Sequence, residues 1–326
     1  MRKRLLFSLV VLLAVFSAVE TWARRGFRVG DEMLAPQNAI YQDDALVFWR
    51  LRPHLRAPQM YGTLTTNSMG MRGPEATQSP APGVHRVIML GESGTMGVGV
   101  DDADTYAAKT QSALDEAQPG KWEVLNAGVG AYTIVQSMLW FEGRGLALQP
   151  STIVVYHELN DYLPTGVIDP ANVLYAVADT DRQMYEKRRY LRPLLELALH
   201  SRAYMRLRKW ILLNKTRLPM IHTVPTVGVR VPRADREWAW NRLVNAAQAA
   251  GVRVVVLRPT YQGWQPHDQL VPWVAKTRGL TLVDLAEARR QSGVPERIYF
   301  YDGVHPARAG TEVIGRAVAK ALLGEG

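Results

Sequence analysis

Short β-branched runs alternate with amphipathic segments from His85 onward, and this alternation is the strongest constraint on the fold of the chain. A helical segment between two strands carries the chain back across the sheet, so that the strands run parallel and helices cover both faces. The sequence therefore predicts a three-layer α/β/α sandwich with a central parallel sheet. The expected strands are 86–90, 122–126, 152–156, 252–257 and 280–285, and the expected helices are 105–117, 133–148, 234–250 and 307–323.

Composition removes several classes of chemistry. The 326 residues include no cysteine, which excludes disulfides, thiolate metal sites and a cysteine nucleophile. The histidines show no metal-ligand spacing, and both the Rossmann fingerprint and the P-loop lysine are missing. We therefore expect neither a metal nor a cofactor.

The basic excess of the chain is concentrated in one segment. The net charge is +9, and residues 182–217 hold eleven basic and two acidic side chains, so the remainder is neutral. This segment belongs to an insertion of about 163–231, which is longer than a crossover requires and is predicted to be helical. Its stretch 201–213 has the spacing of an amphipathic helix. Such a helix either packs on the domain as a solvated insertion or contacts anionic lipid head groups or an anionic glycan. No nucleic-acid-binding motif accompanies the charge, so we expect no nucleic-acid partner.

The N-terminus carries an export pattern. Three basic residues precede the apolar run Leu5–Val19, which indicates a signal-anchor or a cleaved signal peptide over 1–24. The run is short for a spanning helix, and cleavage after Ala18 or Ala23 would use poor sites. We favour an uncleaved anchor in the cytoplasmic membrane, with the bulk of the chain outside the cytoplasm, periplasmic or on the cell surface. Residues 25–84 then form an irregular, proline-broken leader with a short strand pair in 62–72, and residues 85–326 form the main domain.

Two segments carry residues suited to nucleophilic catalysis. Ser93 follows the first strand between Gly91-Glu92 and Gly94, so a tight strand-to-helix turn would expose its hydroxyl at the carboxyl edge of the sheet. Near the other end, Asp302 lies three residues before His305, just before the last helix. An acid in that position can orient an imidazole that takes a proton from a serine.

Together these segments resemble the SGNH hydrolases, also called GDSL esterases and lipases. The four blocks of that family appear in order as Gly91-Glu92-Ser93, Asn126–Thr133, Glu158–Asp161 and Asp302–Pro306. The resemblance covers roughly 85–323. The stretch 67–75 also looks like the leader of membrane-anchored bacterial members.

The resemblance implies a role for each matching residue. Ser93 would be the nucleophile, His305 the general base and acid, and Asp302 the group that orients the imidazole. The Ser93 amide, the Asn160 side chain and an amide of the second block would bind the oxyanion.

Three positions depart from the family pattern. Glu92 replaces the usual aspartate, and Glu158 stands where glycine is frequent and would narrow the site. The glycine that usually supplies the oxyanion amide falls at Ala131, one residue after Gly130, so the choice between these two donors stays open.

The implied activity is hydrolysis of carboxylic esters, with O-acetyl groups on extracellular polysaccharide as the substrate that bacterial relatives suggest. The same triad in an O-acyltransferase would pass the acyl group to a glycan, and a glycan-binding or assembly module would keep the fold without catalysis. The retained Ser93, Asn160, Asp302 and His305 argue against the module. Aromatic candidates for substrate contact are Tyr261, Trp264 and Trp273, while Trp238 and Trp240 suit packing on the sheet or sugar stacking.

Overall fold

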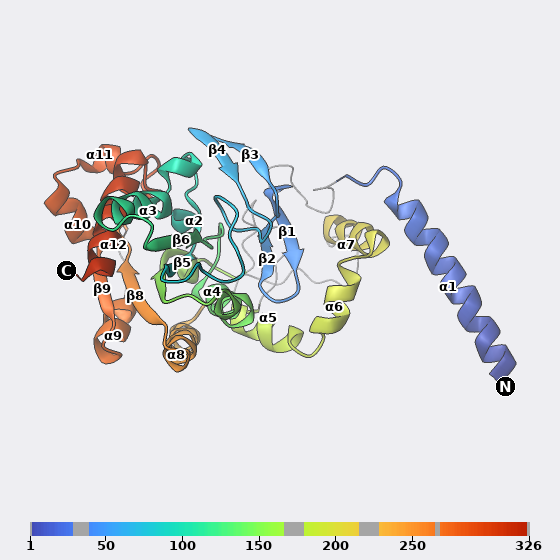
Figure 1. The fold of residues 1–326 in the computed structure, drawn as a ribbon. Coiled ribbons are helices and arrows are strands. Elements are labelled where there is room, and N and C mark those ends of the chain that lie inside the picture. Colours follow the sequence, from blue (N-terminus) through green and yellow to red (C-terminus); the bar gives the residue numbers. More distant parts are fainter. Residues whose placement is uncertain (1, 29–38, 166–178, 215–227, 265–267, 325–326) are drawn as a thin grey trace.

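The computed structural model describes residues 2–28, 39–165, 179–214, 228–264 and 268–324. Its centre is a five-stranded parallel sheet in the order β6-β5-β7-β8-β9 (Figure 1). This confirms the predicted α/β sandwich, and each expected strand lies within two residues of its predicted bounds. The strands are β5 (His85–Gly91), β6 (Trp122–Asn126), β7 (Thr152–Tyr156), β8 (Arg253–Arg258) and β9 (Thr281–Asp284).

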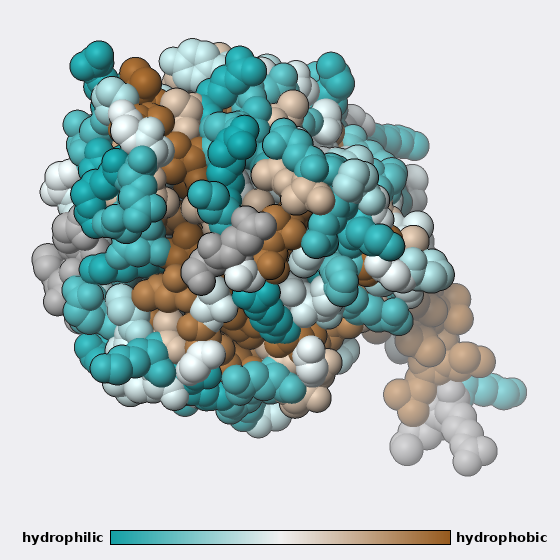
Figure 2. Space-filling model, turned by 60° about the vertical axis from the view of Figure 1, so that its left-hand side comes forward, coloured by the Kyte–Doolittle hydropathy of each residue, from teal (hydrophilic) through white to brown (hydrophobic). Residues whose placement is uncertain are grey.

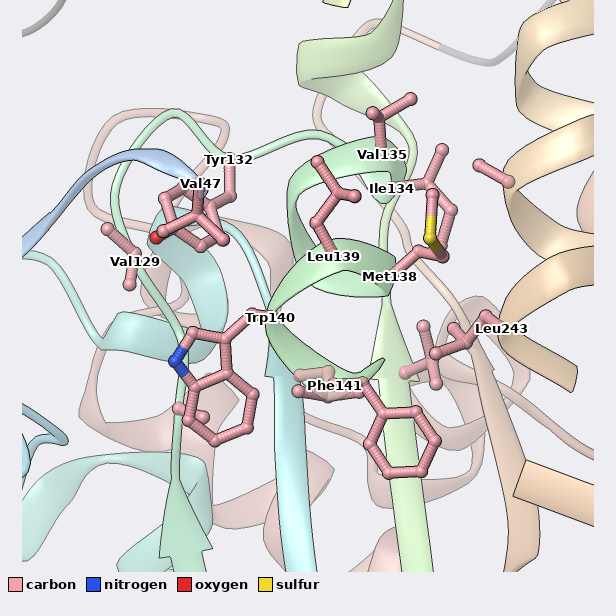
Figure 3. Close-up of a cluster of buried hydrophobic side chains, with 14 of the residues drawn as sticks. Val47, Val129, Tyr132, Ile134, Val135, Met138, Leu139, Trp140, Phe141 and Leu243 are labelled. Carbon is pink, nitrogen blue, oxygen red and sulfur yellow. The ribbon is translucent and has the colours of Figure 1, made fainter. Parts of the chain in front are cut away.

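The sheet is buried on both faces because its strands are apolar at nearly every position. Ile88 and Leu90 face one core with α4 (Ile134–Trp140) and α8 (Arg233–Ala249). Val87 and Met89 face the other, with α3 (Tyr106–Ala117) and α12 (Arg308–Leu323). Successive strand residues point to opposite faces, so each strand serves both cores. Figure 3 shows the first core, where Met138 and Phe141 lie towards Leu243 of α8.

The helix expected over 133–148 is shorter than predicted. After α4 the chain continues as one π-helical turn over Phe141–Gly145 and a 3-10 turn over Leu146–Leu148. Gly143 and Gly145 are poor helix formers. A Cβ on Gly143 would come within 2.4 Å of Leu46 Cδ2, so the glycine makes room for another part of the chain.

The leader 25–84 is more regular than the sequence indicated. It contains two antiparallel hairpins, whose side chains Val47, Phe48, Leu51 and Leu64 are fully buried against the sheet domain. The second hairpin begins earlier than the strand pair expected in 62–72, although Thr66 and Arg72 do form a bridge. The hairpin strands are β1 (Tyr41–Asp44), β2 (Phe48–Leu51), β3 (Arg56–Gln59) and β4 (Gly62–Thr65).

Within the insertion, Pro164 and Val229 form an isolated bridge, and residues 179–214 are mainly helical, as predicted. They hold α5 (Asp181–Arg188), α6 (Arg192–Ala198) and α7 (Arg202–Asn214), while 166–178 and 215–227 lie outside the described residues. In Figure 1, α6 and α7 lie between the sheet domain and the N-terminal helix. The remaining helices are α2 (Ser93–Met96), α9 (Leu270–Thr277), α10 (Leu285–Ser292) and α11 (Glu296–Tyr299).

The N-terminal helix α1 (Arg2–Arg24) projects from the body. Its stretch Lys3–Arg24 is long and apolar enough to cross a membrane, and the apolar part is not buried by the rest of the protein. Figure 2 shows it as a largely hydrophobic rod that extends away from the domain. A helix with these properties occurs both in membrane anchors and in signal sequences.

Candidate active site

Ser93 is the first residue of α2, directly beyond the carboxyl end of β5. Glu92 is still extended and precedes the helix as its N-cap residue. The turn requires glycine at position 91, because a Cβ there would lie 2.0 Å from Thr95 Oγ1 and 2.7 Å from the carbonyl oxygen of Tyr156. At the other end of α2, Gly97 has a φ of 83°, a left-handed conformation that glycine adopts without strain.

The turn before α12 holds His305 beside Asp302 by local hydrogen bonds. Asp302 Oδ1 accepts from the amides of Val304 at 3.0 Å and His305 at 2.7 Å. Its second oxygen, Oδ2, lies 2.6 Å from His305 Nδ1. A single aspartate therefore shapes the turn and orients the ring. Tyr301 stacks on that ring, with 5.6 Å between ring centroids and an interplanar angle of 14°.

The two segments meet, although 212 positions separate them in sequence. His305 Nε2 lies 2.8 Å from Ser93 Oγ. Because the Asp302 carboxylate can only accept, His305 Nδ1 carries a proton and donates it to Asp302, which leaves Nε2 to accept from the serine hydroxyl. The geometry thus provides a serine with a base in hydrogen-bond contact and an acid behind the base.

Asp302 is held in its charged form. Partial burial would raise the pKa of its carboxyl, but the hydrogen bonds from the His305 amide, the His305 ring and the Val304 amide outweigh burial and leave the pKa below its ordinary value. A charged carboxylate at this position stabilises an imidazolium on His305.

The loop after β6 lies against α2. Asn126 Nδ2 donates to the carbonyl oxygen of Thr95 at 2.8 Å, and the Val129 amide donates to that of Gly91 at 3.1 Å. Gly128 permits this approach, since a Cβ on it would lie 2.4 Å from the amide nitrogen of Met96.

Gly130 and Ala131 differ in conformation. Ala131 has a φ of 62°, which is strained for a residue with a Cβ, whereas Gly130 is not in the left-handed region. Gly130 is needed for space instead, because a Cβ would lie 2.2 Å from the Tyr41 hydroxyl. Both carbonyls are occupied, that of Gly130 by Trp49 Nε1 at 3.1 Å and that of Ala131 by Arg230 Nη1 at 2.8 Å.

Three backbone amides and one side-chain amide of the matching segments are candidates to donate a hydrogen bond to an oxyanion. Within the described part of the chain, the amides of Ser93, Gly130 and Ala131 donate no hydrogen bond. Asn160 is buried, and its Nδ2 donates to the carbonyl oxygen of Tyr132 at 3.1 Å. That bond uses one of the two amide hydrogens of Asn160, and the other donates to no acceptor among the described residues.

Glu92, directly before Ser93, is buried. Its Oε2 accepts from the backbone amide of Asn160 at 3.2 Å, and its Oε1 accepts from the Tyr261 hydroxyl at 3.0 Å. Burial, reinforced by nearby Asp161, raises the pKa of Glu92 to about 8 against the opposing hydrogen bonds. The glutamate thus connects the turn at Ser93 to the third block. Tyr261, one of the aromatic candidates for substrate contact, is buried, and its hydroxyl donates to this carboxyl.

The other departures and aromatic candidates also have defined places. Glu158 is 3% exposed, its Oε2 has no hydrogen-bond partner within the described residues, and burial raises its pKa to about 8. The rings of Trp264 and Tyr261 meet edge to face at 5.2 Å, whereas Trp273 is 45% exposed on α9. Trp240 is buried in the core, while Trp238 stacks under Arg182.

Two arginines, Arg72 (buried) and Arg230 (partly buried), hold the backbone near Ser93 and were not identified from the sequence. Arg72 of the leader pairs with Asp102 at 2.7 Å and donates to the carbonyl oxygens of Met96 at 2.8 Å and Val100 at 2.7 Å, which holds the end of α2. Arg230 at the end of the insertion pairs with Asp181 at 2.9 Å and holds Ala131. Their partners are distant in sequence, so no local sequence motif predicts these contacts.

Comparison with known proteins yields structural matches alone. No family model matches the chain, and no curated protein matches it. Three of the structural matches each cover 74% of this chain and 95% of the other. One is a GDSL-like lipase from Parabacteroides merdae (14% identity, TM-score 0.47). Another is an α/β hydrolase enzyme from the Lake Arreo metagenome (17% identity, TM-score 0.45). A third is an acetylxylan esterase from Geobacillus stearothermophilus (15% identity, TM-score 0.44). The geometry of the site itself is therefore the basis for assigning a function.

Proposed function

We propose that this protein is a serine esterase of the SGNH type, with Ser93 as nucleophile, His305 as general base and acid, and Asp302 as the orienting acid. The observation that carries the proposal is the continuous contact from Asp302 Oδ2 to His305 Nδ1 at 2.6 Å and from His305 Nε2 to Ser93 Oγ at 2.8 Å. The order of the four sequence blocks supports the same assignment.

The reaction would proceed in two halves. Ser93 Oγ attacks the acyl carbonyl carbon while His305 Nε2 takes the hydroxyl proton, and the charged Asp302 stabilises the imidazolium. His305 then returns the proton to the leaving alkoxide, which departs as the alcohol and leaves an acyl-serine. In the second half, His305 deprotonates a water that attacks the acyl-serine, and the carboxylic acid is released with Ser93 restored.

The oxyanion in each half would be bound by the Ser93 amide, the free hydrogen of Asn160 Nδ2 and one amide of the second block. We assign the last role to Ala131 rather than Gly130, because strained backbone at a site is retained where function needs it. Each such donor lowers the barrier by about 3 kcal/mol.

We further propose that α1 is an uncleaved signal-anchor, so that residues 25–326 lie outside the cytoplasm as a leader and an SGNH domain. The three basic residues before the apolar run and the unburied apolar surface of α1 support this arrangement. The substrate would then be an extracytoplasmic ester, and the sequence resemblance favours O-acetyl groups on a polysaccharide.

A fluorophosphonate probe tests the nucleophile directly. The full chain in detergent should gain one adduct, located on Ser93 by peptide mass spectrometry, because an activated serine attacks the phosphorus. Ser93→Ala and His305→Ala should abolish the adduct, whereas Ser112→Ala, on the exposed side of α3, should not. An adduct elsewhere, or none on a folded chain, would contradict the assignment.

Hydrolysis and transfer are then separated by product. With an acetylated polysaccharide, free acetate at the rate of deacetylation indicates an esterase. If an added glycan acquires acetyl groups faster than acetate appears, the chain is an acyltransferase instead.

A further inference from the structure

The last turn of α1 is joined to α7, although about 180 residues separate them in sequence. Glu20 Oε2 accepts from Ser201 Oγ at 2.8 Å and from the Ala203 amide at 3.1 Å, and Oε1 accepts from the Arg202 amide at 3.0 Å. A carboxylate of α1 therefore caps the N-terminus of α7, where free amides and the helix dipole favour negative charge.

The contact is reciprocal. Arg206 of α7 donates from Nε to the carbonyl oxygen of Ala23 at 2.9 Å and from Nη2 to that of Arg25 at 3.1 Å. Its guanidinium also lies over the Phe27 ring at 5.5 Å. Ala23 lies in the last turn of α1, where carbonyls have no partner within the helix, and Arg25 directly follows the helix. Helix α7 therefore completes the C-terminus of α1, while α1 completes the N-terminus of α7.

The same helix is attached to the domain. Arg208 forms an ion pair with Asp43 of β1, whose side chain is buried, and Met205 is 6% exposed. The end of α1, α7 and the first hairpin of the leader thus form one connected series of contacts.

Several exposed side chains of this region are apolar. Leu191, directly before α6, and Leu194 and Leu197 within it recur every three residues and are 53%, 66% and 72% exposed. Beside them, Tyr190 is exposed, and α7 exposes Leu207 and Trp210. Exposed apolar side chains that recur along one short segment, as over 190–197, indicate an interaction surface. We call this set the α6–α7 platform: Tyr190, Leu191, Leu194, Leu197, Leu207 and Trp210.

We propose that the α6–α7 platform lies in the interface of an anionic bilayer and is held there by α1. A spanning helix leaves the bilayer at its last turn, and that turn is hydrogen-bonded to the start of α7, so α7 is placed at the level of the head groups. Leucine, tyrosine and tryptophan among arginines and lysines are the side chains that suit this depth. The positive charge concentrated in 182–217 favours anionic lipid.

The inference rests on the proposed anchor and is independent of the esterase. Its consequence is orientation: two elements, α1 and the platform, would contact the membrane and fix how the sheet domain stands on it. A single spanning helix followed by a free linker would leave the domain free to rotate.

The absence of cysteine in the chain permits a direct test of depth. Single cysteines would replace Leu194, Leu197 or Trp210 in the full chain, with Leu12→Cys as the reference within α1. Ile298→Cys is the matched control, because Ile298 is a comparably exposed apolar residue (48%) on α11, at the opposite end of the domain from α7 (Figure 1). Each variant carries an environment-sensitive fluorophore and is reconstituted in phosphatidylcholine vesicles with or without phosphatidylglycerol.

We expect nitroxide-labelled lipid to quench the probes at 194, 197 and 210 several-fold more than the probe at 298, and more strongly when phosphatidylglycerol is present. Quenching at 12 alone would overturn the platform and leave the anchor intact. No quenching at 12 would overturn both. Probes at 194 and 197 that are shielded from aqueous iodide but not quenched by lipid would show a protein partner instead and overturn the proposal. Hydrolysis of p-nitrophenyl acetate, measured on the same samples, reports separately on the esterase.

Discussion

The two turns that meet at the candidate active site are stabilised in different ways. The histidine turn is local: Asp302 shapes it by accepting from residues two and three positions later, and its side chain is 40% exposed. The Ser93 turn is held by distant residues, because Arg72 donates to the end of α2 and Glu92 accepts from Asn160 and Tyr261. A local turn can lose function without losing the fold, whereas the distant contacts of the Ser93 turn are part of the fold.

Asp302→Asn should produce the largest effect, and on activity alone. The amide cannot accept from His305 Nδ1 as a carboxylate does and favours the wrong tautomer, so we expect ester hydrolysis to fall about 10⁴-fold. Thermal unfolding should change little, because Asn can still form the turn through its side-chain oxygen. Steady-state hydrolysis measures the loss of activity, and thermal melting of the same sample measures the stability. A large loss of stability would contradict the local character of this turn.

Arg72→Met, in contrast to Asp302→Asn, should reduce the stability of the fold. It removes the partner of Asp102 and leaves the carbonyls of Met96 and Val100 without a donor in a buried place, so we expect the free energy of unfolding to fall by about 3–5 kcal/mol. Chemical unfolding in detergent measures the loss.

Arg308→Met is the matched control, since Arg308 pairs with Asp104 at 3.1 Å but its side chain is 78% exposed. An exposed pair adds little, and this variant should unfold like the wild type. If Arg72→Met and Arg308→Met were equally stable, Arg72 of the leader would not stabilise the turn at Ser93.

Glu92→Gln should change how stability depends on pH. An unfolded glutamate releases its proton near pH 4.5, whereas burial raises the pKa of folded Glu92 to about 8. Between these values the folded chain binds more protons than the unfolded chain. The contribution of protonated Glu92 to the free energy of unfolding is therefore fully present below about pH 4.5 and is lost as the pH rises towards 8. Glutamine resembles the protonated carboxyl and should reduce that slope.

Melting temperatures across this pH range, compared with those of Glu116→Gln on the exposed side of α3, measure the effect. Glu158 and Asp161 also have raised pKa values, of about 8 and about 7, and leave a residual slope. An unchanged slope in Glu92→Gln would show that Glu92 is charged in the folded chain.

Ala131→Gly should have the smallest effect. Relief of the left-handed strain at φ 62° should stabilise the chain by up to about 1 kcal/mol, partly offset by the greater freedom of glycine in the unfolded chain. Because the amide is retained, ester hydrolysis should remain within severalfold of the wild type. A destabilised variant would show that the alanine methyl packs favourably.

Much of the fold could be predicted from the sequence because its signals are local. β-branched runs and helical spacing predicted the five strands of the sheet and the helices α3, α4, α8 and α12, but not α9 or α10. Helix α4 ends earlier than predicted, before Gly143, which packs close to Leu46. The leader was less predictable, since its prolines suggested irregular chain. Its hairpins are stabilised by burial of Phe48 and Leu64 against the sheet domain rather than by their own pattern.

By itself, the sequence determined the parallel sheet, the glycine-bounded Ser93 turn and the Asp302–His305 turn, because each depends on neighbours within a few positions. The tertiary structure decided the rest. It brought His305 to Ser93, set Arg72 and Arg230 against the backbone of the site, and joined Glu20 to α7. Such contacts join residues brought close by packing, and a hydrogen bond between distant segments leaves no periodic pattern in the chain.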